Sequence, residues 1–249
     1  MKRINRKLSV ILGVLLFLGI GVQGVSAYRG QGGFGGRSQA GTGLTSLVSQ
    51  LPVQDLSDVE KDAVTKMIEE EKLARDVYTY LYKVWNNSVF DRISQSEQRH
   101  MDAVAAILDK YGLANPVAGL DYGQFATPEM QELYDALIAR GQQSLEDAMQ
   151  VGATIEDLDI KDLETLLPQI DNDDIRTVFQ NLMKGSRNHM RAFVSYLKAM
   201  GSNYTAQYLT QAEVDAIVSS SWERGAVDKD GNPMGGFGNG RRGGRWSTR

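Results

Sequence analysis

A glutamate and a histidine on one face of a predicted helix constrain the fold of this chain more than any other feature. Glu97 and His100 lie three residues apart inside a run of apolar residues at helical spacing. Residues three or four positions apart are neighbours on a helix surface, so both side chains belong to the face that packs against other helices. A carboxylate and an imidazole buried together need a partner, and helical bundles supply one by binding paired metal ions through inward-pointing Glu-x-x-His motifs. The stripe consists of Ile93, Glu97, His100, Val104, Ile107 and Leu108.

The second of the two histidines lies in a similar sequence context. His189 belongs to Ser186-Arg187-Asn188-His189-Met190, and alignment on the histidines puts Ser186 at the position of Glu97. Apolar residues follow both histidines at matching spacing, which indicates an internal repeat of a helix pair. One histidine on an apolar face is more often a hydrogen-bonded core residue than a ligand, but two in matching contexts favour a shared site.

The N-terminal residues are typical of a secretory signal. Residues 1–27 begin with four basic residues, continue through an apolar run, and end with the small residues Val25-Ser26-Ala27. We therefore predict an exported protein, extracellular, cell-surface or periplasmic, with an uncleaved N-terminal anchor as the alternative. The chain has no cysteine, which excludes disulfides, thiolate metal sites, iron-sulfur clusters and a cysteine nucleophile.

Both ends of the mature chain are rich in glycine and basic residues, whereas acidic residues outnumber basic ones in between. We expect residues 28–50 to be a disordered Gly-rich linker and residues 225–249 a disordered Gly/Arg-rich tail, because neither segment can bury enough apolar surface to order itself. A basic arm that contacts polyanions is the alternative, without specific nucleic-acid recognition. The run Asp228-Lys229-Asp230-Gly231-Asn232 resembles the start of a calcium loop but has no glutamate at its twelfth position.

Residues 51–224 are predicted to form an all-α, up-down four-helix bundle. Ser57 and Glu60 have the spacing of a capping box, and Gly112 and Gly201 follow segments of helical periodicity. Two long helix pairs joined by a long crossover are the ferritin-like arrangement of such a bundle. We expect its main helices over about residues 58–85, 89–111, 144–167 and 172–200, with short accessory helices over about 127–140 and 208–223.

A paired metal site in this bundle needs carboxylates from the first and third helices as well. On the first helix Glu71 is the best candidate, because it shares an apolar stripe with Tyr78, and Glu70 is the alternative. On the third helix Glu156 and Asp159 share a face with Ala148 and Gly152, and these small residues would leave room for a carboxylate and a cation. We expect Tyr78 to hydrogen-bond a ligand carboxylate and to act as a redox-active neighbour.

Several of these segments resemble known proteins. Glu71-Lys72-Leu73-Ala74-Arg75-Asp76-Val77-Tyr78 and Ser96-Glu97-Gln98-Arg99-His100 resemble the first two helices of rubrerythrin and other ferritin-like di-iron proteins. Residues 60–224, including Glu156-Asp157-Leu158-Asp159-Ile160 and Ser186-Arg187-Asn188-His189, are more closely similar to the domain-of-unknown-function family 2202 of bacteria and archaea. The resemblance implies a di-metal fold but no known substrate.

Each candidate residue takes a role from the resemblance to ferritin-like di-iron proteins. It implies that Glu71 and His100 are terminal ligands of the first metal, that Glu97 bridges the two metals, and that Glu156 serves the second metal with His189. The chain departs from the ferritin-like pattern at Ser186, where the usual motif has a second bridging glutamate. Asp159 is expected to compensate.

The sequence leaves three classes of function open. The first is a di-iron or di-manganese oxidoreductase that oxidises Fe(II) or reduces peroxide or O2, which needs an external electron donor because the chain has no cysteine. The second is a metal-binding or storage protein without catalysis. The third is an exported interaction bundle, without metal, in which the buried glutamates and histidines pair with one another. A homodimer is compatible with all three.

Overall fold

The computed structural model describes residues 43–234, and these form an all-α helical bundle, as predicted. Its only β pairing in that range is an isolated bridge between Val227 and Pro233. The elements are α2 (Leu44–Gln50), α3 (Asp58–Trp85), α4 (Ser88–Lys110), α5 (Pro128–Gly141), α6 (Leu145–Leu166), the 3-10 turn η1 (Leu167–Gln169), α7 (Asp173–Ala199) and α8 (Gln211–Ser219).

Local signals explain where the long helices begin and end. The Ser57 side chain accepts from the Glu60 backbone N–H, and the Glu60 carboxylate accepts from the Ser57 backbone N–H, so the predicted capping box is present. Helix α3 ends at Asn86, which has a left-handed backbone with φ 48°. Helix α7 begins differently: Asn172 makes no side-chain cap, and the backbone N–H groups of Asp171 and Asn172 donate instead to Glu60 of α3.

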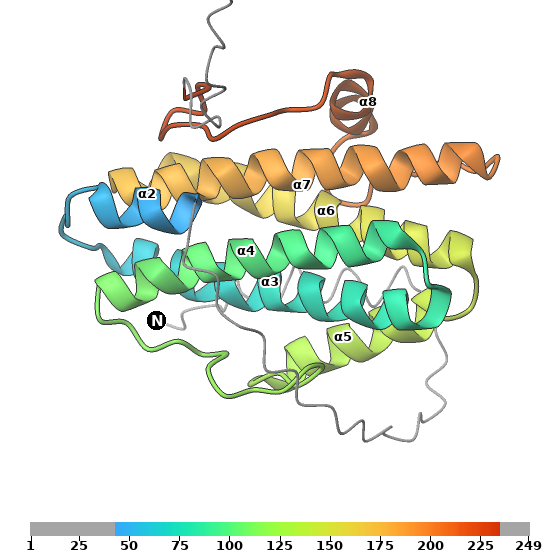
Figure 1. Cartoon of the computed structure of the whole chain (residues 1–249), viewed down its shortest axis with the longest axis horizontal. Helices are drawn as coiled ribbons and strands as arrows, with labels where there is room; N and C mark the ends of the chain where they lie inside the picture. The colour runs from blue at the N-terminus through green and yellow to red at the C-terminus, as the bar shows by residue number, and fades with distance from the viewer. Residues whose placement is uncertain (1–42, 235–249) are drawn as a thin grey trace, which may run out of the picture.

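The four long helices form two antiparallel pairs, α3 with α4 and α6 with α7 (Figure 1). The pairs meet where α4 packs on α7 and α3 on α6. Helices α3 and α7 run in one direction and α4 and α6 in the other (Figure 1). Side chains from all four helices therefore face the same central space.

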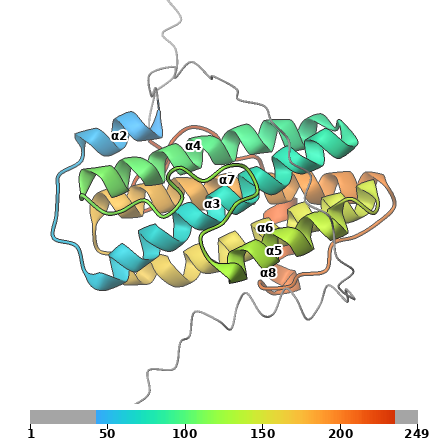
Figure 2. The ribbon, with the colours of Figure 1, turned by 90° about the horizontal axis from the view of Figure 1, so that it is seen from below.

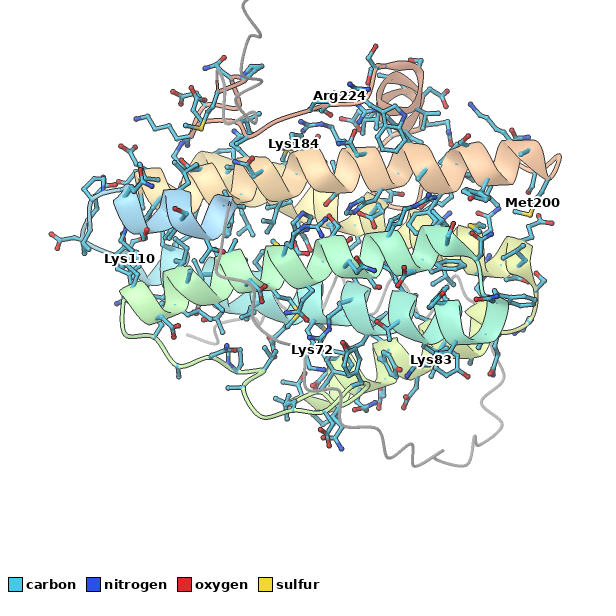
Figure 3. All side chains as sticks on the ribbon, in the orientation of Figure 1. Lys72, Lys83, Lys110, Lys184, Met200 and Arg224 are labelled. Atoms are coloured by element: carbon cyan, nitrogen blue, oxygen red, sulfur yellow. The ribbon has the colours of Figure 1, made fainter. Side chains whose placement is uncertain are left out.

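A long crossover that contains α5 carries the chain from the end of α4 back to the start of α6, and it runs across α3 and α4 on the way (Figure 2). Buried Lys72 anchors it, because its ammonium donates to the backbone oxygen of Asp121 and pairs with Asp76. Asp76 in turn accepts from the Gly123 backbone N–H at 3.0 Å. Figure 3 shows Lys72 on the side of α3 that faces this crossover.

A polar layer divides the apolar core of the bundle into two clusters. One cluster contains Tyr78, Phe90 and Phe193 and lies toward the α3–α4 turn. The other contains Met67, Val104 and Phe179 and lies toward the opposite end. Between them each long helix places buried polar side chains, namely Glu70, Glu71, Glu97, His100, Glu156, Asp159, Ser186 and His189.

Two expectations about the ends of the folded region were wrong. The predicted linker 28–50 contains α2, which buries Val48 against α4 and α7. Lys110 holds this segment by donating to the backbone oxygens of Val48 and Leu51 (Figure 3). The predicted tail 225–249 is folded over its first part, because Asn181 of α7 exchanges two hydrogen bonds with Val227 at 2.7 and 3.0 Å.

The predicted signal at residues 1–27, most of the predicted linker and residues 235–249 of the predicted tail lie outside the described residues. Among the described helices, none is both long enough and apolar enough to cross a membrane.

Candidate metal centre

Five acidic and histidine side chains converge in the polar layer. Glu71 comes from α3, Glu97 and His100 from α4, Glu156 from α6 and His189 from α7. The three glutamates are at most 2% exposed and each histidine 8%. Carboxylates at this depth are strongly disfavoured unless a cation or hydrogen-bond donors compensate them.

The first group consists of Glu71, Glu97 and His100. The Nδ1 atom of His100 lies 3.1 Å from Glu71 Oε2 and 2.6 Å from Glu97 Oε2. Glu97 and His100 are one helical turn apart on α4, so the helix itself sets their relative position. Glu71 reaches them from α3, which packs tightly against α4.

The second group consists of Glu97, Glu156 and His189. The Nδ1 atom of His189 lies 2.7 Å from Glu97 Oε1 and 3.5 Å from Glu156 Oε2. Despite these distances, Glu97 Oε1, Glu156 Oε2 and His189 Nδ1 are buried without a hydrogen-bond partner in the described residues. His189 Nδ1 therefore faces carboxylate oxygens from two other helices, an arrangement that a shared cation would satisfy.

Glu97 belongs to both groups and turns a different oxygen to each histidine. The rings of His100 and His189 stack with centroids 5.7 Å apart and an angle of 28°. Within each group the ligand atoms lie within 4.8 Å of one another, so each group could hold a metal ion. Carboxylate and neutral imidazole donors without thiolates suit a divalent ion of hard or intermediate character.

In the pKa values of these residues, burial and the charges of neighbouring groups act in opposite directions. Burial raises the pKa of Glu71 to about 7, although His100 acts in the opposite direction. Burial also raises the pKa of Glu156, against the pull of His189. Burial alone would raise the pKa of Glu97 as well, but the two histidines outweigh it and lower that pKa. Burial would lower the pKa of His100, yet Glu71 and Glu97 raise it to about 9.

Comparison with known proteins places this centre in a family. The family described as "Uncharacterized protein domain (DUF2202)" matches residues 60–221. The chain belongs to the DUF2202 family. It is 53% identical over 182 residues to "Uncharacterized protein MJ0754" of Methanocaldococcus jannaschii, an alignment that covers 73% of this chain and 98% of that protein. The crystal structure of MJ0754 matches with a TM-score of 0.68 over 70% of this chain and 99% of that one.

The DUF2202 match includes all five converging residues. The description of the family and the names of its relatives assign no function. The relation to rubrerythrin and the ferritin-like proteins therefore stays a prediction.

Tyr78 of the DUF2202 domain lies where the sequence places it, beside a candidate ligand. It is fully buried, and its hydroxyl donates to Glu156 Oε1 at 2.6 Å. This bond occupies one oxygen of Glu156 and leaves Oε2 turned to His189. Burial and the charges of Glu156 and Glu97 raise the pKa of Tyr78 well above its usual value, so the phenol remains a hydrogen-bond donor.

Other candidates lie outside the two groups. Asp159 is 5% exposed and one turn beyond Glu156, but it belongs to neither group. Ser186 donates to the backbone oxygen of Leu182 in its own helix at 3.2 Å. Glu70, the alternative to Glu71, pairs with Lys66. Asp76, also on α3, pairs with Lys72 and Arg75 and supports the crossover.

Two glycines shape the surroundings of the centre, and the sequence analysis missed the role of both. A Cβ at Gly185 of α7 would lie 2.5 Å from His100 Cε1, so only glycine leaves room for that ring. Gly152 of α6 was expected to leave room for a cation, but the ring of Phe193 fills the space, 2.5 Å from where a Cβ would lie. A glycine inside a helical pattern is the signal that points to such close approaches.

Proposed function

We propose that the polar layer is a dinuclear metal centre in which Glu97 bridges two divalent ions. The observation that carries the proposal is the geometry of Glu97, whose two oxygens face two different histidines. Glu71 and His100 would complete one site, and Glu156 and His189 the other. Three of the ligand atoms are buried without a hydrogen-bond partner among the described residues, which favours a bound cation over a layer of hydrogen-bonded pairs.

Iron or manganese is the metal that suits this set of ligands best. Each site has carboxylate oxygens and one imidazole nitrogen, and the chain has no cysteine for softer ions. Three carboxylates leave one positive charge uncompensated when two divalent ions bind. Buried Asp159 is close enough in sequence to Glu156 to supply the missing negative charge from outside the two groups.

When bound, two Fe(II) ions would supply the electrons to reduce O2 or peroxide. The protein contributes position and environment. Tyr78 holds Glu156 in place through its 2.6 Å hydrogen bond. Apolar clusters above and below the layer exclude bulk water. The two histidines are the more exposed members of the centre, so a small oxidant would reach it beside α4 and α7.

Metal analysis of the purified chain tests this function. Protein loaded anaerobically with Fe(II) should hold two ions per chain, and each of the variants His100→Ala and His189→Ala should hold fewer. Glu164→Gln on α6 is a matched control, because Glu164 lies on the surface and pairs with Lys161. Addition of peroxide or O2 should then change the absorbance of the loaded protein. A chain that binds neither iron nor manganese would refute the proposal.

Metal storage without turnover is a second candidate, and Ser186 favours it. Ser186 bonds to its own helix, so the centre has one bridging carboxylate where the related motif has two. The amount of oxidant consumed distinguishes the two functions. A catalyst consumes many equivalents of oxidant when an external reductant is present, whereas a storage protein consumes only the amount that oxidises its bound iron.

We also propose that the chain is exported, on the strength of residues 1–27. An exported centre without cysteine would take its electrons from a separate donor. Expression of the full chain with its N-terminus intact, followed by mass analysis of the cell-free fraction, tests this proposal. Retention of the unprocessed chain inside the cell would contradict it.

A further inference from the structure

A second cluster of charged side chains lies between α3 and α6, next to the centre. Its members are Glu70 of α3, Asp162 of α6, and Lys66, which lies one turn before Glu70. The Lys66 ammonium is 2.9 Å from Glu70 Oε1 and 2.5 Å from Asp162 Oδ2. One positive charge thus compensates two carboxylates.

Lys66 compensates the negative charge of Glu70 only in part. Its side chain is 8% exposed, and its second oxygen, Oε2, is buried without a hydrogen-bond partner among the described residues. A buried carboxylate oxygen without a hydrogen-bond donor can bind a cation. A divalent ion compensates its charge more fully than an ammonium does.

Lys66 is the one member of this cluster that can leave it easily. Its side chain is 42% exposed, while those of Glu70 and Asp162 are 8% and 12% exposed. A lysine side chain rotates about four carbons and is well hydrated outside the protein. Movement of Lys66 into solvent would leave two nearby carboxylates that open toward the surface.

The position of the cluster relates it to the centre. Glu70 is the sequence neighbour of Glu71, and Asp162 lies six residues beyond Glu156 on α6. Asp159 lies between Glu156 and Asp162, three residues from each, so it is a neighbour of both on the surface of α6. Carboxylates therefore extend from the centre to the surface at Lys66.

We propose that Glu70 and Asp162 form a separate site for one hard divalent cation, which binds by displacing the ammonium of Lys66. Carboxylate oxygens are the ligands that Mn²⁺, Fe²⁺, Mg²⁺ and Ca²⁺ share. A divalent ion compensates both carboxylates where lysine supplies a single charge, and it can also bind the free Glu70 Oε2. This site does not require that the dinuclear centre be occupied.

Mn²⁺ binding to the full chain tests the site, with free Mn²⁺ measured from its electron paramagnetic resonance amplitude. Lys66→Gln removes the competing ammonium, so Mn²⁺ should bind this site about tenfold more tightly or better. Glu70→Gln and Asp162→Asn should abolish the same binding. Lys61→Gln is the matched control, because Lys61 lies on the same helix and pairs with exposed Asp58.

Thermal unfolding provides a second readout that does not depend on counting ions. Lys66→Gln leaves two buried carboxylates without a cation, so its Tm should fall in chelator and recover with Mn²⁺ by more than that of the wild type. The double variant with both Lys66→Gln and Glu70→Gln should not regain Tm when Mn²⁺ is added. The comparison remains decisive even if one single variant folds poorly.

The outcomes separate this site from the dinuclear centre. Mn²⁺ binding that responds to Lys66→Gln and Glu70→Gln supports the site, whether or not Glu97→Gln changes the rest of the binding. Equal Mn²⁺ affinity and equal recovery of Tm in Lys66→Gln, Glu70→Gln and the wild type would overturn it. In that case Lys66 is a permanent partner of the two carboxylates.

Discussion

The ring of His100 lies directly against the backbone of Gly185. A Cβ at Gly185 would be 2.5 Å from His100 Cε1 and 2.7 Å from Nε2, which is closer than Cβ atoms approach other heavy atoms in proteins. This contact fixes the ring between α4 and α7 and turns its Nδ1 to Glu71 and Glu97. The position of a candidate ligand thus depends on the absence of a side chain in another helix.

Gly185→Ala should therefore displace His100 and weaken the site that it shares with Glu71. Alanine favours a helix interior over glycine by about 1 kcal/mol, so helix propensity alone predicts a gain in stability. We expect the clash to outweigh this gain and to reduce metal content from two ions to one. Metal analysis with thermal unfolding checks this. Two ions per chain together with a higher Tm would contradict the assigned contact.

Ser186→Ala, at the next position of the same helix, should leave metal content unchanged. The Ser186 hydroxyl bonds to Leu182 and is absent from both ligand groups. Alanine fits the same volume and has the higher helix propensity. Loss of an ion from this variant, measured by the same metal analysis, would mean that Ser186 is a ligand after all.

Tyr78→Phe should weaken metal binding at the Glu156 and His189 site without unfolding the bundle. The change removes the donor to Glu156 and is expected to reduce the free energy of unfolding by about 1 kcal/mol. Loss of a residue that orients a ligand typically weakens metal affinity by about 10-fold to 100-fold. Competition with a chelator measures the metal affinity of both sites. An equal loss of affinity at the two sites would show that Tyr78 acts on overall stability instead.

Glu60→Gln should destabilise the bundle at neutral pH. Glu60 caps α3 and also accepts from the backbone N–H groups of Asp171 and Asn172 at the start of α7. Burial opposes the charged form, but these donors outweigh burial and lower the pKa of Glu60 from 4.5. We expect a loss of about 1 to 3 kcal/mol from denaturant unfolding.

The pH dependence of this effect follows from the direction of the shift. Because the folded-state pKa of Glu60 is below its ordinary value of 4.5, the stabilisation is complete above that pH and disappears as the pH falls through the folded-state pKa. The wild type and Glu60→Gln should therefore converge in acid. Glu213→Gln is the control, because Glu213 caps only the short helix α8. A difference that grows in acid would contradict this account.

The sequence was sufficient to predict features that depend on local spacing. The capping box at Ser57 and Glu60 and the Glu97 to His100 spacing are contained within single turns, so the long helices and the shared helix face followed from them. Helix α2 was missed because its stability comes from burying Val48 and from Lys110, which lies far along the chain. The composition of residues 44–50 carries no information about contacts with residues so far along the chain.

The candidate centre was predictable in part for the same reason. Two histidines in matching contexts, one glutamate on each of two other helices and Tyr78 could be found from their helix faces. The role of Gly152 could not, because the ring that fills its space belongs to Phe193 of another helix. The pairing of Glu70 with Lys66 and Asp162 likewise depends on how α3 packs on α6.

Metal analysis of Glu97→Gln tests the central claim most directly. Glu97 is the only residue shared by both ligand groups, so its replacement should remove both ions, whereas Glu71→Gln and Glu156→Gln should each remove one. Glu164→Gln should keep two. Two ions bound to a folded Glu97→Gln chain, or the same metal content in all four variants, would contradict a centre bridged by Glu97.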